Sequence, residues 1–227
     1  MGQRRPAKDQ PKSFQWTPEN QTWCEAQMKK YPSGRQASCV IPFLWRGQKQ
    51  DGWVSIPMME AIAQQLDMPY IRVYEVATFY TMFNLAPVGE FHVQLCGTTP
   101  CMLRGAQDLR EVCKDVIGPE MKVSDDGKFT WLEVECLGAC CNAPMAQIST
   151  NDGDHYYEDL TTENFKDLLE NLRAGKKVEP GPQRADRHSS EPVEERKTLN
   201  DPALYDGSAA KPLKKIPNSE PADAAPA

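Results

Sequence analysis

Residues 91–101 read FHVQLCGTTPC. The first five residues alternate between apolar and polar types, which is the period of a strand with one buried face. Cys96 and Cys101 follow in a C-x4-C pair, so both thiols leave the sheet in the loop after the strand. This stretch predicts a strand that ends in two sulfur ligands.

A second stretch repeats this arrangement. Residues 129–140 read FTWLEVECLGAC, in which the aromatic and β-branched residues of 129–134 favour a strand. Cys136 and Cys140 then form a C-x3-C pair. If the two strands are neighbours in one sheet, both loops emerge at the same end of it, and four thiolates converge.

Two cofactors suit four thiolates. Zinc takes them as one tetrahedral set, and a [2Fe–2S] cluster takes two on each iron. The spacing alone leaves both open. Gly97 and Gly138 favour iron–sulfur, because they allow peptide N–H groups to turn toward the sulfurs and such bonds tune a reduction potential. Pro100 and Pro144 stiffen the loops, which limits reorganisation during electron transfer.

The other four cysteines have simpler interpretations. Eight cysteines without a signal-type apolar segment are expected to be ligands, redox groups or buried residues rather than disulfides. Cys24, Cys39 and Cys113 lie on helical patterns and are predicted to be buried. Cys141 adjoins Cys140 and is a minor alternative ligand. The sequence has no C-x-x-C and no histidine arranged against a cysteine, so we predict no catalytic residue on this chain.

The pattern around the two loops predicts a small α+β domain of thioredoxin-like size. Strand and helix patterns follow one another in the order β-α-β-β-β-α. The expected elements after the first strand are a helix over 103–117, strands at 129–134, 146–150 and 155–157, and a helix from Thr161 to a Gly175 stop. We expect this domain to span residues 87–175.

Upstream, residues 17–86 predict a helical bundle. Four helical patterns follow one another, over 17–32, 37–45, 55–66 and 71–83. Pro42 predicts a kink or a late start in the second. The last carries apolar residues nearly all round, which indicates a helix covered partly by its own fold and partly by another protein.

The two ends of the chain differ from this core. Residues 1–16 are polar and are expected to form a flexible arm. Residues 176–227 hold 8 of the 19 prolines and few apolar residues, which predicts a largely irregular tail. The alternative is a strap on a partner, with Leu199, Leu204 and Tyr205 as anchors.

Composition narrows the function further. The 227 residues carry 26 Lys and Arg against 32 Asp and Glu, a net charge of −6, which argues against nucleic acid as the main partner. No apolar run reaches the roughly 20 residues of a membrane span, so we expect no direct membrane insertion. The N-terminus is a poor signal or transit peptide. Without a glycine-rich nucleotide motif, the chain is not expected to bind NAD, FMN or ATP itself.

Four motifs occur in order along the chain: the run RVYEVATFY at 72–80, the Cys96–Cys101 pair, LRGA at 103–106, and CLGAC at 136–140 with Ala143-Pro144. Together they resemble the 24 kDa (NuoE-type) subunit of respiratory complex I. The resemblance covers residues 17–175. It implies a helical N-terminal region followed by a thioredoxin-like [2Fe–2S] ferredoxin domain.

The resemblance also implies a function. It implies one [2Fe–2S] cluster, of the type called N1a, ligated at Cys96, Cys101, Cys136 and Cys140. The partner implied is the subunit that binds FMN and NADH, with other iron–sulfur subunits nearby. The setting implied is the peripheral arm of NADH:quinone oxidoreductase, a translocase, on the cytoplasmic side of a bacterial inner membrane or the matrix side in a mitochondrion.

Three alternatives remain at this point. The first is the diaphorase subunit of an NAD-linked hydrogenase or formate dehydrogenase, which has the same chemistry and another acceptor. The second is a zinc-stapled binding module without a redox role. The third is a free ferredoxin, against which the long tail and the apolar run at 72–80 argue.

Overall fold

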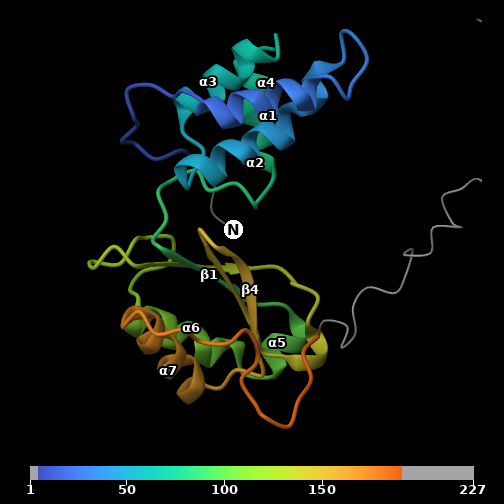
Figure 1. Ribbon diagram of the computed structural model, residues 1–227. Helices are drawn as coiled ribbons and strands as arrows, with labels where there is room; N and C mark the ends of the chain where they lie inside the picture. The colour runs from blue at the N-terminus through green and yellow to red at the C-terminus, as the bar shows by residue number, and fades with distance from the viewer. Residues whose placement is uncertain (1–4, 191–227) are drawn as a thin grey trace, which may run out of the picture. The chain divides into compact units, whose positions relative to one another are not determined.

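The computed structural model describes residues 5–190, and the structural statements below concern that part of the chain. Four helices come first, and strands and helices then mix (Figure 1). The helices are α1 (Pro18–Met28), α2 (Val40–Asp51), α3 (Ile56–Gln65), α4 (Tyr70–Phe79), α5 (Thr99–Leu103), α6 (Ala106–Val116) and α7 (Thr162–Arg173), with short 3-10 helices η1 (Gln36–Cys39) and η2 (Cys140–Asn142). The strands are β1 (Phe91–Cys96), β2 (Phe129–Val134), β3 (Ala146–Thr150), β4 (Gly153–Glu158) and β5 (Gly181–Pro182). The predicted α+β class is confirmed.

Side-chain caps start the N-terminal helices. The Thr17 hydroxyl accepts the Asn20 amide at the start of α1, and the Ser55 hydroxyl accepts the Met58 amide at the start of α3. A proline in the first turn of each helix has the backbone angle that a helix needs and lacks an amide that would go unpaired. Pro42 lies in the first turn of α2, so the predicted late start is correct.

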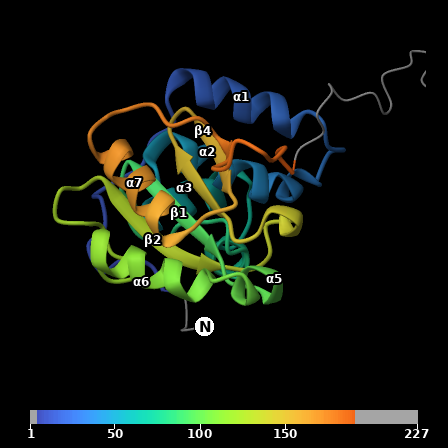
Figure 2. The ribbon, with the colours of Figure 1, turned by 90° about the horizontal axis from the view of Figure 1, so that it is seen from below.

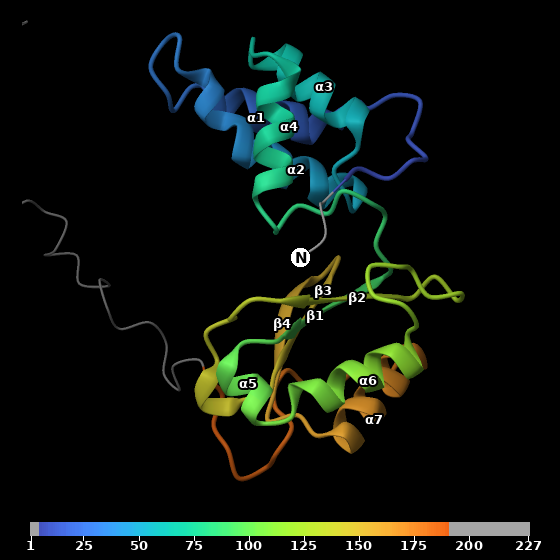
Figure 3. The same ribbon diagram turned by 180° about the vertical axis from the view of Figure 1, so that it is seen from behind.

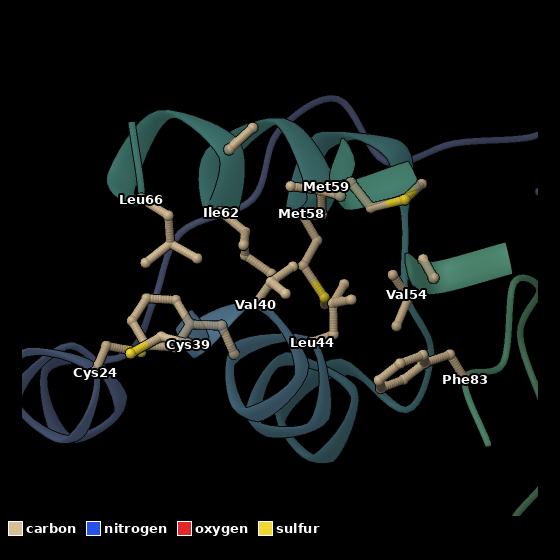
Figure 4. Close-up of a cluster of buried hydrophobic side chains, with 14 of the residues drawn as sticks. Cys24, Cys39, Val40, Leu44, Val54, Met58, Met59, Ile62, Leu66 and Phe83 are labelled. Carbon is tan, nitrogen blue, oxygen red and sulfur yellow. The ribbon is translucent and has the colours of Figure 1, made fainter. Parts of the chain in front are cut away.

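These four helices share one apolar core. Figure 4 shows Met58 and Ile62 of α3, and Leu66 directly after it, pointing toward Val40 and Leu44 of α2. All five side chains are buried. Each turn of α3 therefore presents apolar residues to α2, as the helical period predicts.

Helix α4 ends four residues before the predicted position. Tyr80 leaves the helix in an extended conformation. The chain then turns so that Phe83 enters the core, where it is fully buried, and Asn84 donates its amide to Gln48 Oε1 at 2.6 Å. Tertiary contacts at the end of the helix thus outweigh the helical pattern that continues in the sequence.

The five strands form one mixed sheet in the order β2-β1-β3-β4-β5. Strands β1 and β2 are parallel neighbours, with Phe91 opposite Phe129 and Cys96 opposite Val134. Strand β3 runs antiparallel to both β1 and β4. The short β5, which the sequence did not predict, pairs with the end of β4. The neighbouring strands needed to bring the two cysteine loops together are therefore present.

Helices α6 and α7 pack side by side on one face of the sheet (Figures 1 and 2). Buried Leu109 and Cys113 of α6 and Phe165 and Leu169 of α7 belong to one core cluster with Trp131 of β2. The helix predicted over 103–117 is present as α6, which begins three residues later than predicted. The sequence did not predict α5, which Gly105 separates from α6; the φ of Gly105, 103°, is left-handed and favours glycine.

The two ends of the described chain lie against the folded core. Ala7 donates its amide to the Leu85 carbonyl at 2.8 Å, and Trp16 Nε1 donates to Gln65 Oε1 at 2.8 Å. At the other end, Gln183 donates its amide to the Glu158 carbonyl at 2.8 Å. The tail anchors proposed from the sequence, at 199, 204 and 205, lie outside the described residues.

The apolar residues form two main clusters, one from Cys24 to Leu85 and one from Val93 to Leu172. The expected division between domains 17–86 and 87–175 falls between them and stays a prediction. Between residues 5 and 190, no helix combines the length and the apolar character needed to cross a bilayer.

Candidate metal centre

The two cysteine loops leave the sheet at the same end. Cys96 is the last residue of β1 and lies opposite Val134, the last residue of β2. The Gly97 amide continues the ladder by donating to the Val134 carbonyl at 3.1 Å. In Figure 3, α5 lies beside the loop that follows β2. The expectation that both loops emerge at the same end of one sheet is confirmed.

The first thiol pair is buried. Cys96 ends β1 and Cys101 lies in α5, and each side chain is 1% exposed. Both belong to a small apolar cluster with Ala139 and Met145. The Thr98 hydroxyl lies 3.5 Å from Cys96 Sγ and provides a polar contact inside the loop.

The second thiol pair is exposed. Cys136 Sγ and Cys140 Sγ lie 3.5 Å apart. Gly138 has a φ of 87°, and its amide donates to Cys136 Sγ at 3.4 Å. The predicted turning of a peptide N–H toward sulfur is therefore present at Gly138.

Gly97 has a different role. Its amide serves the sheet ladder rather than a sulfur. A Cβ at this position would lie 2.3 Å from Glu133 Oε1, so the glycine leaves room for that side chain. Glu133 pairs with Arg110 at 2.9 Å. The prediction that Gly97 frees an amide for sulfur is wrong.

Hydrogen bonds from each cysteine loop lower the pKa of a thiol in the other loop. Burial raises the pKa of the Cys96 thiol, but bonds from Thr98, from Cys101 and from the Leu137 amide outweigh it, so the pKa lies below its ordinary value. The Gly138 amide is the largest cause that lowers the pKa of Cys136, with further bonds from Cys140 and Thr98. Thr98 of the first loop and Leu137 of the second each act on a thiol of the other loop.

The pKa of the second thiol in each pair is raised rather than lowered. Burial raises the pKa of Cys101 to about 12, and the neighbouring Cys96 sulfur adds to the rise. The shared bond with Cys136 raises the pKa of Cys140. In each pair, one thiol therefore loses its proton more readily than the other. Thiolates are the form that binds metal, so loading all four positions releases protons.

This donor set fits a two-iron cluster. Two thiolates on one tetrahedral metal lie about 3.8 Å apart when the metal–sulfur bond is about 2.3 Å. Cys136 and Cys140 come close to that separation. Within residues 5–190, no group of three or more His, Cys, Asp or Glu side chains is placed to hold a metal ion as the side chains stand. Two thiol pairs match the two irons of a [2Fe–2S] cluster, which take two thiolates each.

The remaining cysteines lie where the sequence predicts. Cys24, Cys39 and Cys113 are fully buried, and burial raises the pKa of Cys113 to about 12. Cys141 is exposed, and its carbonyl accepts a hydrogen bond from Arg187 at 2.6 Å. Neither Arg187 nor Thr98 was predicted as a site residue. Only the position of Thr98 inside the C-x4-C loop offered a signal.

Comparison with known proteins agrees with this geometry. The sequence model of the thioredoxin-like [2Fe-2S] ferredoxin family matches residues 24–173. The NADH-quinone oxidoreductase E 1 subunit of Rhizobium meliloti is 50% identical over 208 residues, which cover 89% of this chain and 74% of the relative. The E subunit of Rickettsia bellii is 47% identical over 163 residues, which cover 71% of this chain and 95% of the relative. The chain belongs to the family of NADH-quinone oxidoreductase E subunits.

This membership confirms the resemblance found in the sequence. Members of the E-subunit family are parts of an oxidoreductase complex, and the matching ferredoxin family supports an iron–sulfur cluster. A crystal structure of an NAD+-reducing [NiFe]-hydrogenase in the air-oxidized state shares the fold, with a TM-score of 0.51 and 15% identity. That likeness covers 60% of this chain and 23% of the hydrogenase chain, and it shows the fold alone.

Proposed function

We propose that this chain transfers electrons within NADH-quinone oxidoreductase through one [2Fe–2S] cluster. Cys96 and Cys101 would hold one iron, and Cys136 and Cys140 would hold the other. The observation that carries the proposal is that both thiol pairs follow the same end of two parallel strands, with hydrogen bonds from each loop reaching a thiol of the other. The family match supports the nature of the cluster.

When bound, the cluster supplies one-electron storage, and all-cysteine ligation favours a potential in the region of roughly −400 mV. The chain's own residues set its surroundings. Buried Cys96 and Cys101 keep water from one side, whereas Cys136 and Cys140 lie at the surface. The exposed pair is the shorter route for electrons to and from another protein.

The partner on that route is the subunit that binds FMN and NADH. This chain would stand beside it in the peripheral arm of the complex, on the cytoplasmic side of the bacterial inner membrane. The family names of the relatives support a place in such a complex. Isolation of the complex with the chain tagged tests the assignment, since a diaphorase of a hydrogenase or formate dehydrogenase would bring different subunits with it.

Replacing a single thiol tests the ligands. Cys101→Ser should leave the fold largely intact and remove the native reduced-state EPR signal, because serine oxygen replaces a sulfur ligand. Cys113→Ser is the matched control, since Cys113 is equally buried but lies in α6 within the other core cluster. An unchanged EPR spectrum in Cys101→Ser would contradict the ligand assignment. An iron and zinc count of the wild-type chain separates the cluster from a zinc staple.

A further inference from the structure

The segment from Gly181 to Ser190 lies across the turn that carries Cys140. In Figures 1 and 3 the last described residues run beside the loop after β2. This segment, called the strap below, follows the residues matched by the ferredoxin family. Its contacts with the turn are polar and specific, and the electron-transfer proposal makes no use of them.

Asn142 is the centre of these contacts. It ends the 3-10 turn that begins at Cys140, and it is 4% exposed. Its side-chain amide donates to Glu158 Oε2 at 2.6 Å and to the His188 carbonyl at 2.7 Å. Its own carbonyl accepts the Asp159 amide at 2.8 Å. The turn is therefore fixed to β4 on one side and to the strap on the other.

Arg187 provides the second set of contacts. Its Nη2 donates to the Cys141 carbonyl and to Asn142 Oδ1, both at 2.6 Å. Its Nε donates to Asp159 Oδ2 at 3.2 Å, and the Asp159 side chain is 3% exposed. One planar guanidinium thus joins three acceptors with a fixed geometry, which the single ammonium of lysine does not reproduce.

The strap is itself anchored on the other side of the turn. Ser190 donates its amide to Glu158 Oε2 at 3.0 Å, and its hydroxyl donates to Glu158 Oε1. Glu158 is 1% exposed, so these donors and Asn142 satisfy a buried carboxylate. With Arg187 held between these anchors, the strap restrains Cys140–Asn142 from outside the ferredoxin core.

We propose that Arg187 is a positioning residue for the cluster, because it fixes the Cys140–Asn142 turn through the Cys141 carbonyl and Asn142. This inference rests on the proposed function, in which Cys140 is a ligand. Groups that orient metal ligands from behind them commonly change metal affinity about 10- to 100-fold when removed. Loss of Arg187 should therefore loosen the cluster without removing any sulfur.

The test uses the full chain with its cluster. In Arg187→Gln, the release of iron to a ferrous chelator should be about 10-fold faster than in the wild type. The reduced-state EPR signal should broaden, because the Cys140 geometry becomes heterogeneous. Arg187→Lys keeps the positive charge but loses the forked guanidinium. Its rate of iron release should therefore lie between the rates of the wild type and of Arg187→Gln. Arg184→Gln is the matched control, since Arg184 pairs with Asp186 in the strap at 2.9 Å and both side chains are exposed.

A second variant separates positioning from general stability. Arg187→Gln leaves buried Asp159 without its cation, which by itself weakens the fold. In the double variant Asp159→Asn with Arg187→Gln, that unpaired charge is gone while the Cys141 carbonyl still lacks its donor. Fast iron release and a broad signal should persist. Wild-type behaviour of the double variant would overturn the inference.

The two proposals fail in different ways. A wild-type chain without a [2Fe–2S] spectrum would overturn the proposed function and this inference with it. A normal wild-type spectrum, together with identical iron release in Arg187→Gln and Arg184→Gln, would overturn only the role of Arg187.

Discussion

At the scale of single residues, Gly138 combines a left-handed backbone with a bond to sulfur. Its φ is 87°, and its amide donates to Cys136 Sγ at 3.4 Å. Gly138→Ala should cost about 1 kcal/mol of folding free energy, because a Cβ is disfavoured in this conformation. If the loop relaxes, the bond to sulfur is lost, and the reduced, more negative cluster loses stabilisation. The midpoint potential should then fall, as measured by an EPR redox titration.

Gly52 provides the control for this prediction. It ends α2 with a φ of 82°, and an alanine Cβ would meet open space there, as it would at Gly138. Gly52→Ala should lower the thermal midpoint by a similar amount and leave the reduction potential unchanged. Equal potentials in the two variants would show that the Gly138 amide does not tune the cluster.

The burial of His92 should make the stability of the fold depend on pH. The side chain lies in β1, is 6% exposed, and has no partner for Nδ1 among the described residues. Burial lowers its pKa to about 4, although a bond to the Thr130 backbone and the charge of Asp154 act in the opposite direction. An unfolded histidine has a pKa near 6.5. Between pH 6.5 and 4 the unfolded chain therefore binds a proton that the folded chain does not.

Stability should fall as the pH decreases through this window, by up to about 1.4 kcal/mol per pH unit from this group. Urea midpoints at pH 7, 6 and 5 measure the slope. His92→Gln should flatten it relative to the wild type. His155→Gln, at an exposed position in β4, should not. A slope that is the same in all three proteins would exclude His92 as its source.

At the scale of elements, helix α7 shows how a local signal is completed in three dimensions. Thr161 accepts the Asn164 amide at 3.2 Å, and Asn164 Oδ1 accepts the Thr161 amide at 2.7 Å, so the pair forms a full capping box. The sequence offers asparagine where glutamate or glutamine is usual. The shorter side chain still reaches the Thr161 amide, and its own amide group also donates to the Asp159 carbonyl at 3.2 Å.

Removing this cap should cost about 1 kcal/mol. Thr161→Ala leaves the Asn164 amide without its acceptor at the start of α7. Thr162→Ala, one residue later and inside the helix, removes a hydroxyl of the same kind without touching the box. Thermal unfolding of the two variants should show the larger loss for Thr161→Ala. Equal losses would mean that the box contributes nothing to stability.

Helix boundaries were the least predictable part of the fold. Caps and prolines placed the starts of α1, α3 and α7 correctly. The end of α4 and the break at Gly105 were missed, because each depends on where the chain must go next rather than on local propensity. Strand β5 has only two residues and exists because β4 offers it a free edge.

At the scale of the whole molecule, the candidate site divides into a predictable and an unpredictable part. The placement of both cysteine pairs at one end of the sheet follows from two strand patterns that each end in a pair, because parallel pairing brings those ends together. Arg187 and Asn142 are 45 positions apart, and no motif marks either. Contacts of this kind depend on the folded path of the chain, so sequence patterns carry no sign of them.

The contacts of the strap predict how far the C-terminus can be shortened without loss of stability. A chain ending at Ser190 keeps every contact of the strap with Asn142 and Glu158. A chain ending at Gly175 loses Arg187, the cation paired with buried Asp159, and the Ser190 donors to buried Glu158, which then keeps only its bond from Asn142. Leaving a buried charge without its partner costs about 3–5 kcal/mol. The shorter chain should therefore melt at a clearly lower temperature and lose its visible iron–sulfur absorbance first.

Circular dichroism and absorbance recorded in one thermal scan check this prediction. In the chain ending at Ser190, the two transitions should coincide with those of the full chain. In the chain ending at Gly175, bleaching of the cluster should precede unfolding, because the Cys140–Asn142 turn is released while the core formed by α6, α7 and the sheet is still intact. Equal melting temperatures for the two truncations would mean that residues 176–190 add nothing to the stability of the fold.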